Sequence, residues 1–106
     1  MRKYVILILF VLIIICTGCS ANPDATYRVW YHGNENTYGF PPNDPNEYKT
    51  GMEAVVLGSN TLLKTGYVFK NWNTKQDGAG TSYDAGSKIT IKNLAVFLYA
   101  MWTPAP

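Results

Sequence analysis

The sequence contains few of the residues from which catalytic and metal sites are usually built. Among its 106 residues there is one histidine, His32, and no Ser–His–Asp or His–His spacing accompanies it. We therefore interpret His32 as a surface residue at the end of a strand. A glycine-rich phosphate loop is also lacking, because no helical pattern follows Gly78 and Gly80. From these absences we predict that the protein is not an enzyme and that it holds no cofactor or metal ion.

Long hydrophobic runs are lacking too. The longest apolar run, from Tyr4 to Cys16, has 13 residues, whereas a membrane-spanning helix needs about 20. This run follows the cations Arg2 and Lys3 and precedes small residues, which is typical of a secretory signal peptide. The alternative is an N-terminal anchor helix that is not cleaved.

The residues after this run resemble the lipobox of bacterial lipoproteins. In Cys16-Thr17-Gly18-Cys19 small residues precede a cysteine, although the family prefers leucine at the place of Cys16. The resemblance implies that residues 1–18 are a lipoprotein signal peptide, and that Cys19 becomes the first mature residue and carries a diacylglycerol. Two acyl chains hold a protein stably on a bilayer. We therefore expect a lipoprotein anchored on the extracytoplasmic face of the cell envelope.

A chain processed in this way would lack both free thiols and net charge. Removal of Cys16 and lipidation of Cys19 leave no thiol for a disulfide, a nucleophile or a structural zinc. The whole sequence has nine Lys and Arg against seven Asp and Glu, and Arg2 and Lys3 account for the excess of +2. A neutral mature domain argues against nucleic acid as a partner and against electrostatic binding to a membrane.

Behind the anchor, the chain is organised as a short tether and one small domain. Residues 19–26, the lipidated cysteine and a polar stretch broken by a proline, read as the tether. The aromatic and β-branched residues that follow predict short strands, and only residues 59–64 could form a helical turn. The predicted strands cover residues 27–32, 53–57, 66–73, 88–91 and 96–102.

Two irregular stretches interrupt this regular pattern. Asn71 breaks the alternation of the 66–73 strand, and we predict a bulge that turns Trp72 inward. Residues 33–47 form a long loop, because three prolines deny it regular pairing. A loop of this length in a compact domain is either functional or mobile.

Most of the mature domain resembles a known repeat. Glycines, aromatic residues and asparagines recur at the family's spacing in Tyr31-x-Gly33-Asn34, Gly66-Tyr67-x-Phe69-x-x-Trp72-Asn73-Thr74, Asp77-Gly78-x-Gly80-Thr81-x-Tyr83 and Leu98-Tyr99-Ala100-x-Trp102. On these motifs, residues 27–103 resemble the internalin-type B-repeat, also called the Listeria–Bacteroides repeat. The resemblance implies a small β-grasp-like single domain of the α+β class, predominantly β, with about five short strands and at most one short helix. The core that it implies consists of Phe69, Trp72, Tyr83, Leu98, Ala100 and Trp102.

Aromatic side chains on the outside of the domain are the main candidates for a binding site. Exposed aromatic residues favour contact with proteins or glycans, and Met101 joins them because related repeats usually have glutamine at that place. The candidate binding surface comprises Trp30, Tyr38, Phe40, Tyr99 and Met101. The alternative is that most of these side chains pack in the core or cover sheet edges.

Two other motifs have simpler explanations. The spacing from Asn73 to Asp84 imitates a calcium loop, but Lys75 stands where an oxygen ligand belongs, and a hairpin turn accounts for the same residues. Acidic residues in or near the 33–47 loop could pair as in a glycosidase, although so small a domain rarely has a deep cleft. These residues are Glu35, Asp44, Glu47 and Glu53.

The sequence therefore favours a lipid-anchored, non-catalytic module of the cell envelope that mediates protein or glycan interaction or acts as a structural spacer. Its expected partners are the membrane, through the lipid on Cys19, and an envelope or host protein or a polysaccharide. Nucleic acid is not expected, and the oligomeric state stays open. The alternative is a small envelope enzyme or inhibitor that uses the 33–47 loop.

Overall fold

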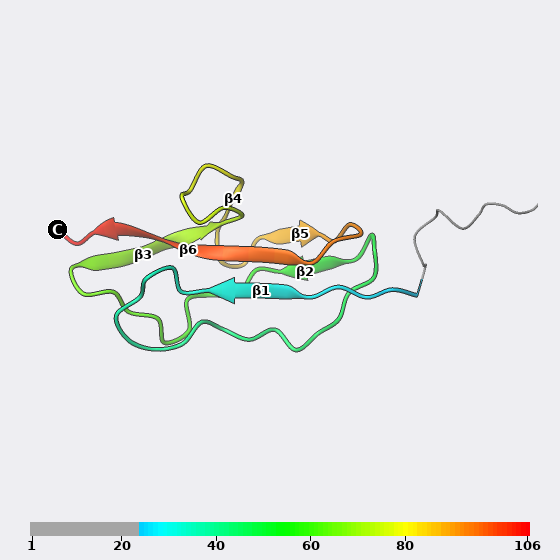
Figure 1. Ribbon diagram of the computed structural model, residues 1–106, viewed down its shortest axis with the longest axis horizontal. Helices are drawn as coiled ribbons and strands as arrows, with labels where there is room; N and C mark the ends of the chain where they lie inside the picture. The colour runs from blue at the N-terminus through cyan, green and yellow to red at the C-terminus, as the bar shows by residue number, and fades with distance from the viewer. Residues whose placement is uncertain (1–23) are drawn as a thin grey trace, which may run out of the picture.

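The computed structural model describes residues 24–106, which form two β-sheets (Figure 1). In this range there is no helix, and hence none with the length and apolar character needed to span a bilayer. The strands are β1 (Val29–His32), β2 (Glu53–Val55), β3 (Tyr67–Asn73), β4 (Ser82–Tyr83), β5 (Lys88–Thr90) and β6 (Val96–Pro104). The predicted signal peptide, residues 1–18, and the predicted lipidation site, Cys19, lie outside the described residues.

The larger sheet has the strand order β1-β6-β3-β4, with β6 as a long central strand. β6 pairs in parallel with β1 and antiparallel with β3, so the first and last strands lie side by side. Along β6, Leu98 and Ala100 are completely buried, whereas Phe97 and Tyr99 point to the other side. This alternation gives the sheet one buried face and one outward face.

The pairing of β3 with β6 contains the predicted bulge. Phe69 lies opposite Trp102 and Asn71 lies opposite Met101, so Lys70 is the extra residue on β3. Residues three positions apart would otherwise point to opposite faces. Because of the bulge, Trp72 is fully buried on the same side as Phe69.

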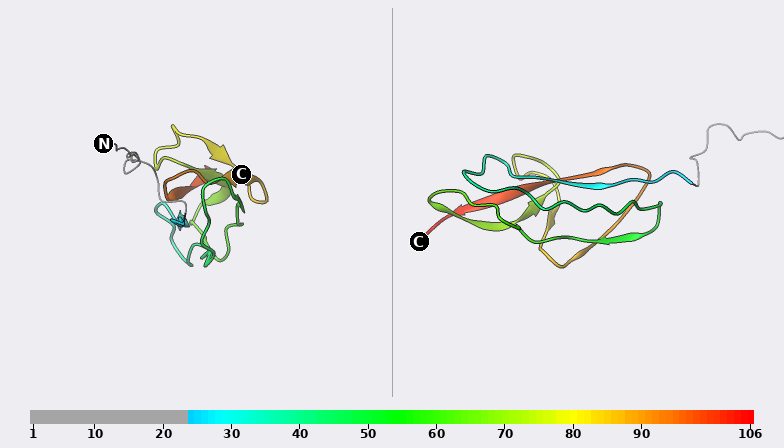
Figure 2. Two further views of the ribbon diagram at one scale, coloured as in Figure 1. Left: turned by 90° about the vertical axis from the view of Figure 1, so that its right-hand side faces the viewer. Right: turned by 90° about the horizontal axis from the view of Figure 1, so that it is seen from below.

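The smaller sheet covers the buried face of the larger one. In it β2 and β5 run antiparallel, with Ala54 opposite Ile89 and both side chains buried. The right-hand view of Figure 2 shows this pair on one side of the layer formed by β1 and β6. The core contains Val29, Tyr31, Tyr48, Ala54, Val56, Leu62, Trp72, Ile89, Ile91, Leu98 and Ala100. The other implied core residues, partly buried against this cluster, are Phe69, Tyr83 and Trp102.

Two aromatic side chains join the sheets through the backbone of one residue. The N–H of Leu57 donates to Tyr31 Oη at 2.9 Å, and the carbonyl of Leu57 accepts from Trp72 Nε1 at 2.8 Å. The rings of Tyr31 and Trp72 meet edge to face, with centroids 4.8 Å apart. Leu57 lies just beyond the end of β2, so these side chains satisfy backbone groups that no strand reaches.

The predominantly β fold class is confirmed. Residues 59–64 form a tight turn in place of the helical turn that they could have made, with the N–H of Leu62 bonded to the carbonyl of Ser59 at 3.0 Å. Asn60 has a φ of 57°, outside the helical range. A segment this short does not offset the cost of nucleating a helix. β4 was not predicted, because two residues are too few to show an alternating pattern.

The 33–47 loop returns beside β1, an edge strand of the larger sheet (Figures 1 and 2). Tyr27 and Tyr48 exchange two backbone hydrogen bonds of 2.8 Å, which fix the end of this segment. Its prolines cannot donate, so it runs along the edge without extending the sheet. Gly39 allows a close approach, because its φ is 82° and a Cβ there would lie 1.9 Å from the carbonyl oxygen of Thr61.

Candidate functional site

The outward face of the larger sheet gathers aromatic side chains from β1 and β6. In the parallel ladder Trp30 lies opposite Phe97 and His32 lies opposite Tyr99, and opposed residues share a face. Trp30 is 43% and Phe97 is 54% exposed, which are high values for large apolar side chains. We call Trp30, His32, Phe97, Tyr99 and Met101 the outward aromatic face. Three of the five predicted binding residues therefore lie together on it.

Neighbouring groups hold the rings of this face in place. The guanidinium carbon of Arg28 lies 4.4 Å from the centre of the Trp30 ring. The same guanidinium donates from Nη2 to the carbonyl oxygen of Asp44 at 2.8 Å. His32, exposed at the end of β1 as predicted, has its ring 5.3 Å from that of Tyr99. Rings that are already ordered lose little conformational freedom when a partner contacts them.

Met101 is only partly exposed, because the β3–β4 connection lies against it. Its Sδ is 3.2 Å from the position that a Cβ on Gly78 would occupy. The connection is organised by Asn73, which is 2% exposed. Its amide donates to the carbonyl of Gly78 at 3.1 Å, and its oxygen accepts from the N–H groups of Lys75 and Gly80, each at 2.9 Å.

These hydrogen bonds show that Asn73, in the calcium-like spacing, shapes a turn. Asn73, the first residue of that spacing, uses both ends of its amide to shape the turn between β3 and β4. Within residues 24–106, no three or more His, Cys, Asp or Glu side chains are grouped as a metal ion would need.

Tyr38 and Phe40 form a second group, away from the outward aromatic face. They are 66% and 77% exposed and belong to the 33–47 loop. Tyr38 exchanges backbone hydrogen bonds of 3.0 and 2.9 Å with Leu63, and the N–H of Phe40 donates to Thr61 Oγ1 at 2.9 Å. Leu63, 62% exposed, extends this second apolar group.

Among the predicted acidic residues, Asp44 is buried and has a structural role. Its side chain is buried, and its Oδ2 accepts a hydrogen bond of 2.6 Å from the hydroxyl of Tyr48. Its Oδ1 accepts from the N–H of Asn46 at 2.9 Å. Burial and the bond to Asp44 both raise the pKa of Tyr48 above its usual value. The hydrogen bond between Asp44 and Tyr48 attaches the end of the 33–47 loop to the core.

The other acidic residues contact different groups. Glu47 accepts a hydrogen bond of 2.6 Å from Thr26 Oγ1, Glu53 lies 4.0 Å from the ammonium of Lys88, and Glu35 is exposed. These contacts do not assemble the carboxylate pair of a glycosidase.

Phe97 also lines an open groove of about 390 Å³. Its lining residues come from the position just after β3, from β4 and β5, from the β5–β6 connection and from the start of β6: Thr74, Tyr83, Ile89, Thr90, Lys92, Leu94, Ala95, Val96 and Phe97. Phe97 is shared by the groove and the outward aromatic face. Phe97 was not among the predicted site residues, although its alternation with Leu98 in the 96–102 strand would have placed it outward.

Comparison with known proteins agrees with the repeat motifs. The family model of the Listeria-Bacteroides repeat domain matches residues 27–101 of this chain. A protein of Evansella cellulosilytica named "Putative membrane protein" is 34% identical over 76 residues, which cover 72% of this chain and 11% of that protein. Another from the same organism, named "Putative Gly-rich membrane protein", is 36% identical over 77 residues, covering 72% and 9%.

The chain spans about a tenth of the length of these curated relatives. No solved structure matches it. The family match covers the bulge of β3, the turn organised by Asn73 and most of β6. The resemblance of residues 27–103 to this repeat is thereby confirmed, and the chain belongs to the Listeria-Bacteroides repeat domain family.

Proposed function

We propose that the protein is a lipid-anchored, non-catalytic module on the extracytoplasmic face of a bacterial cell envelope. Diacylglycerol on Cys19 would hold it on the membrane, and residues 27–103 would act as the functional domain. The lipobox-like sequence supports the anchor, and the two relatives named as membrane proteins support a place at a membrane. In this proposal the domain binds an envelope or host protein or a polysaccharide.

The observation that carries the binding role is the outward aromatic face. Trp30 and Phe97 expose 43% and 54% of their surface side by side on two paired strands. An aromatic ring offers both apolar area and a polarised face, which suits sugar rings and protein side chains alike. The second apolar group, around Tyr38 and Phe40, serves as the control surface in the binding test.

The anchor is tested by expressing the full chain in bacteria supplied with a labelled fatty acid. Wild type and Cys16→Ser are expected to incorporate the label and to remain with the membrane. Cys19→Ser is expected to lose both the label and membrane retention, because the acylated thiol is gone. Label on Cys19→Ser, or no label on wild type, contradicts the anchor.

The binding role is tested with purified peptidoglycan and a glycan array as probes. Trp30→Ala and Phe97→Ala are expected to weaken binding about tenfold or more, since exposed aromatic anchors dominate such contacts. Leu63→Ala is the matched control, because Leu63 is even more exposed than Trp30 and Phe97 but lies in the second apolar group. Equal affinity of all variants argues against the outward aromatic face as the site.

A further inference from the structure

Three segments of the chain meet at the end of the domain where the described residues begin, at Asp24. Tyr27 and Tyr48 exchange backbone hydrogen bonds, and the N–H of Val96 bonds to the carbonyl of Arg28 at 3.0 Å. Figure 1 shows the chain before β1, the turn before β2 and the β5–β6 connection together at this end. We call this end, made of residues 24–28, 47–53 and 91–96, the tether end.

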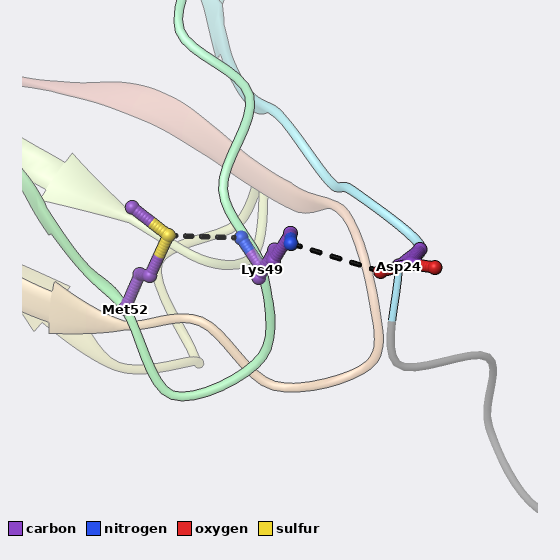
Figure 3. Close-up of polar contacts among 3 residues, drawn as sticks. All are labelled: Asp24, Lys49 and Met52. Carbon is purple, nitrogen blue, oxygen red and sulfur yellow. Dashed lines mark hydrogen bonds and ion pairs between the residues drawn. The ribbon is translucent and has the colours of Figure 1, made fainter.

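Two apolar side chains are exposed at the tether end. Leu94, in the β5–β6 connection, is 73% exposed, and Met52 is 46% exposed. Hydrogen bonds fix the turn that carries Met52. The Met52 Sδ accepts from the N–H of Lys49 at 3.2 Å (Figure 3), and the Met52 carbonyl accepts from the N–H of Ile91 at 2.8 Å. Both residues therefore expose apolar surface at the same end, Met52 from a hydrogen-bonded turn and Leu94 from the connection that leads into β6.

Charge at the tether end is balanced. Its basic residues are Arg28, Lys49 and Lys92, and its acidic residues are Asp24, Glu47 and Glu53. Lys49 lies 3.8 Å from Asp24 (Figure 3). A balanced end is neither drawn to nor driven from a charged surface over distance, so contact there depends on apolar groups.

We propose that the tether end contacts the membrane, with Leu94 and Met52 inserted into the interfacial region of a phospholipid bilayer. This rests on the proposed lipid anchor at Cys19. Five residue steps separate Cys19 from Asp24, and at about 3.6 Å each they span at most about 18 Å. The lipid therefore keeps the tether end beside the bilayer, at a high effective concentration. Apolar side chains at an interface lose contact with water, which favours insertion.

The orientation has a consequence for binding. β1 and β6 start at the tether end and run away from it, so their free ends would point away from the membrane. The outward aromatic face would then stand at the side of the domain, open to partners in the envelope. The bilayer is favoured over a protein as occupant because the tether holds it within reach at all times.

The test places an environment-sensitive fluorophore at Leu94→Cys in the full, lipidated chain. In the mature chain this thiol is the only reactive one, since Cys19 carries the lipid. The matched control is Leu63→Cys, because Leu63 is 62% exposed and precedes β3, whose first residue pairs with Pro104 at the far end of β6. The probe membranes are phosphatidylcholine vesicles with and without brominated acyl chains.

Position 94 is expected to be quenched by brominated lipid about threefold more than position 63, as for a side chain at the acyl boundary. Quenching should persist at about 0.5 M salt, because no net charge takes part. Equal quenching at both positions overturns the proposal. Shielding of position 94 in cells but not in vesicles also overturns it, and assigns the tether end to a protein.

The intact mass of the same sample distinguishes a failure of the membrane contact from a failure of the lipid anchor at Cys19. If Cys19 carries diacylglycerol and position 94 is not quenched, the membrane contact is wrong and the anchor stands. If Cys19 carries no lipid, the anchor fails and the contact fails with it. The variant Leu94→Asp offers a second readout: a fluorophore at Met52→Cys should lose most of its quenching, while tryptophan fluorescence stays native.

Discussion

The hydroxyl of Tyr48 is the contact whose removal tests most directly what the 33–47 loop does. The substitution Tyr48→Phe removes one oxygen atom and keeps the ring, which is buried in the core. It deletes the 2.6 Å hydrogen bond to Asp44 and leaves the buried Oδ2 of that carboxylate without this donor. The bond from the N–H of Asn46 to Oδ1 remains.

The expected cost is large for a domain of this size. A hydrogen bond to a charged group contributes about 1.5–3 kcal/mol, and an unpaired buried group adds its own desolvation cost. Domains of about 80 residues unfold with a free energy of about 4–12 kcal/mol. Tyr48→Phe should therefore lower the free energy of unfolding by about 2–3 kcal/mol.

Urea unfolding of the detergent-solubilised chain, followed by tryptophan fluorescence, measures this change, because Trp72 is fully buried in the folded state. With a slope of about 1 kcal/mol per M, the midpoint should fall by about 2–3 M while the slope stays constant. Tyr38→Phe is the control, since Tyr38 is 66% exposed. Equal midpoints for the two variants would refute the structural role of the pair.

A double variant tests whether the buried charge of Asp44 causes part of the loss of stability. Adding Asp44→Asn to Tyr48→Phe replaces a buried, under-bonded carboxylate by a neutral amide whose oxygen can still accept from the N–H of Asn46. Because a neutral group costs less to bury than a charge, the double variant should be more stable than Tyr48→Phe alone. A further loss of stability in the double variant would contradict this account.

Three further predictions follow from other contacts. Tyr31→Phe leaves the N–H of Leu57 without its 2.9 Å acceptor and should cost about 1–3 kcal/mol in the same urea experiment. Gly39→Ala should destabilise far more than Gly51→Ala, because a Cβ would clash at 1.9 Å with backbone at Gly39 but meets nothing within 4 Å at Gly51, where only the φ of 94° adds strain of about 1–2 kcal/mol. Burial raises the pKa of Tyr31 and Tyr48 in the folded state, so the unfolded chain ionises first, near its ordinary value of about 10. The contribution of these two tyrosines to stability should be constant below about pH 10 and should be lost as the pH rises further, and a titration of the urea midpoint above about pH 10 should show a weaker fall in Tyr48→Phe.

Individual elements show how far the sequence could predict this fold. The aromatic and β-branched residues of 27–32 predicted a strand there, and β1 has the alternating burial of a strand with one face in the core. The bulge at β3 was predictable because a polar residue broke the alternation just before a tryptophan. β4 escaped prediction, since two residues become a strand only through pairing with β3.

The candidate site was less predictable than the strands. Trp30, Tyr99 and Met101 were expected to face outward and do lie on one face, but Tyr38 and Phe40 belong to a separate group. Whether two exposed aromatic residues are neighbours depends on which strands pair and in what register. That register is set by long-range contacts, which a local sequence pattern does not contain.

The sequence by itself determined the elements whose cause is local. Alternation of apolar and polar residues specified the strands, prolines prevented pairing in the 33–47 loop, and the spaced motifs identified the repeat family. The tertiary structure alone decided the partners: Phe97 lies beside Trp30, Asp44 accepts a hydrogen bond from Tyr48, and Leu57 is bonded to Tyr31 and Trp72. These contacts join residues distant in the chain or unpaired until the layers pack, so their energies arise only when the two sheets close on one core.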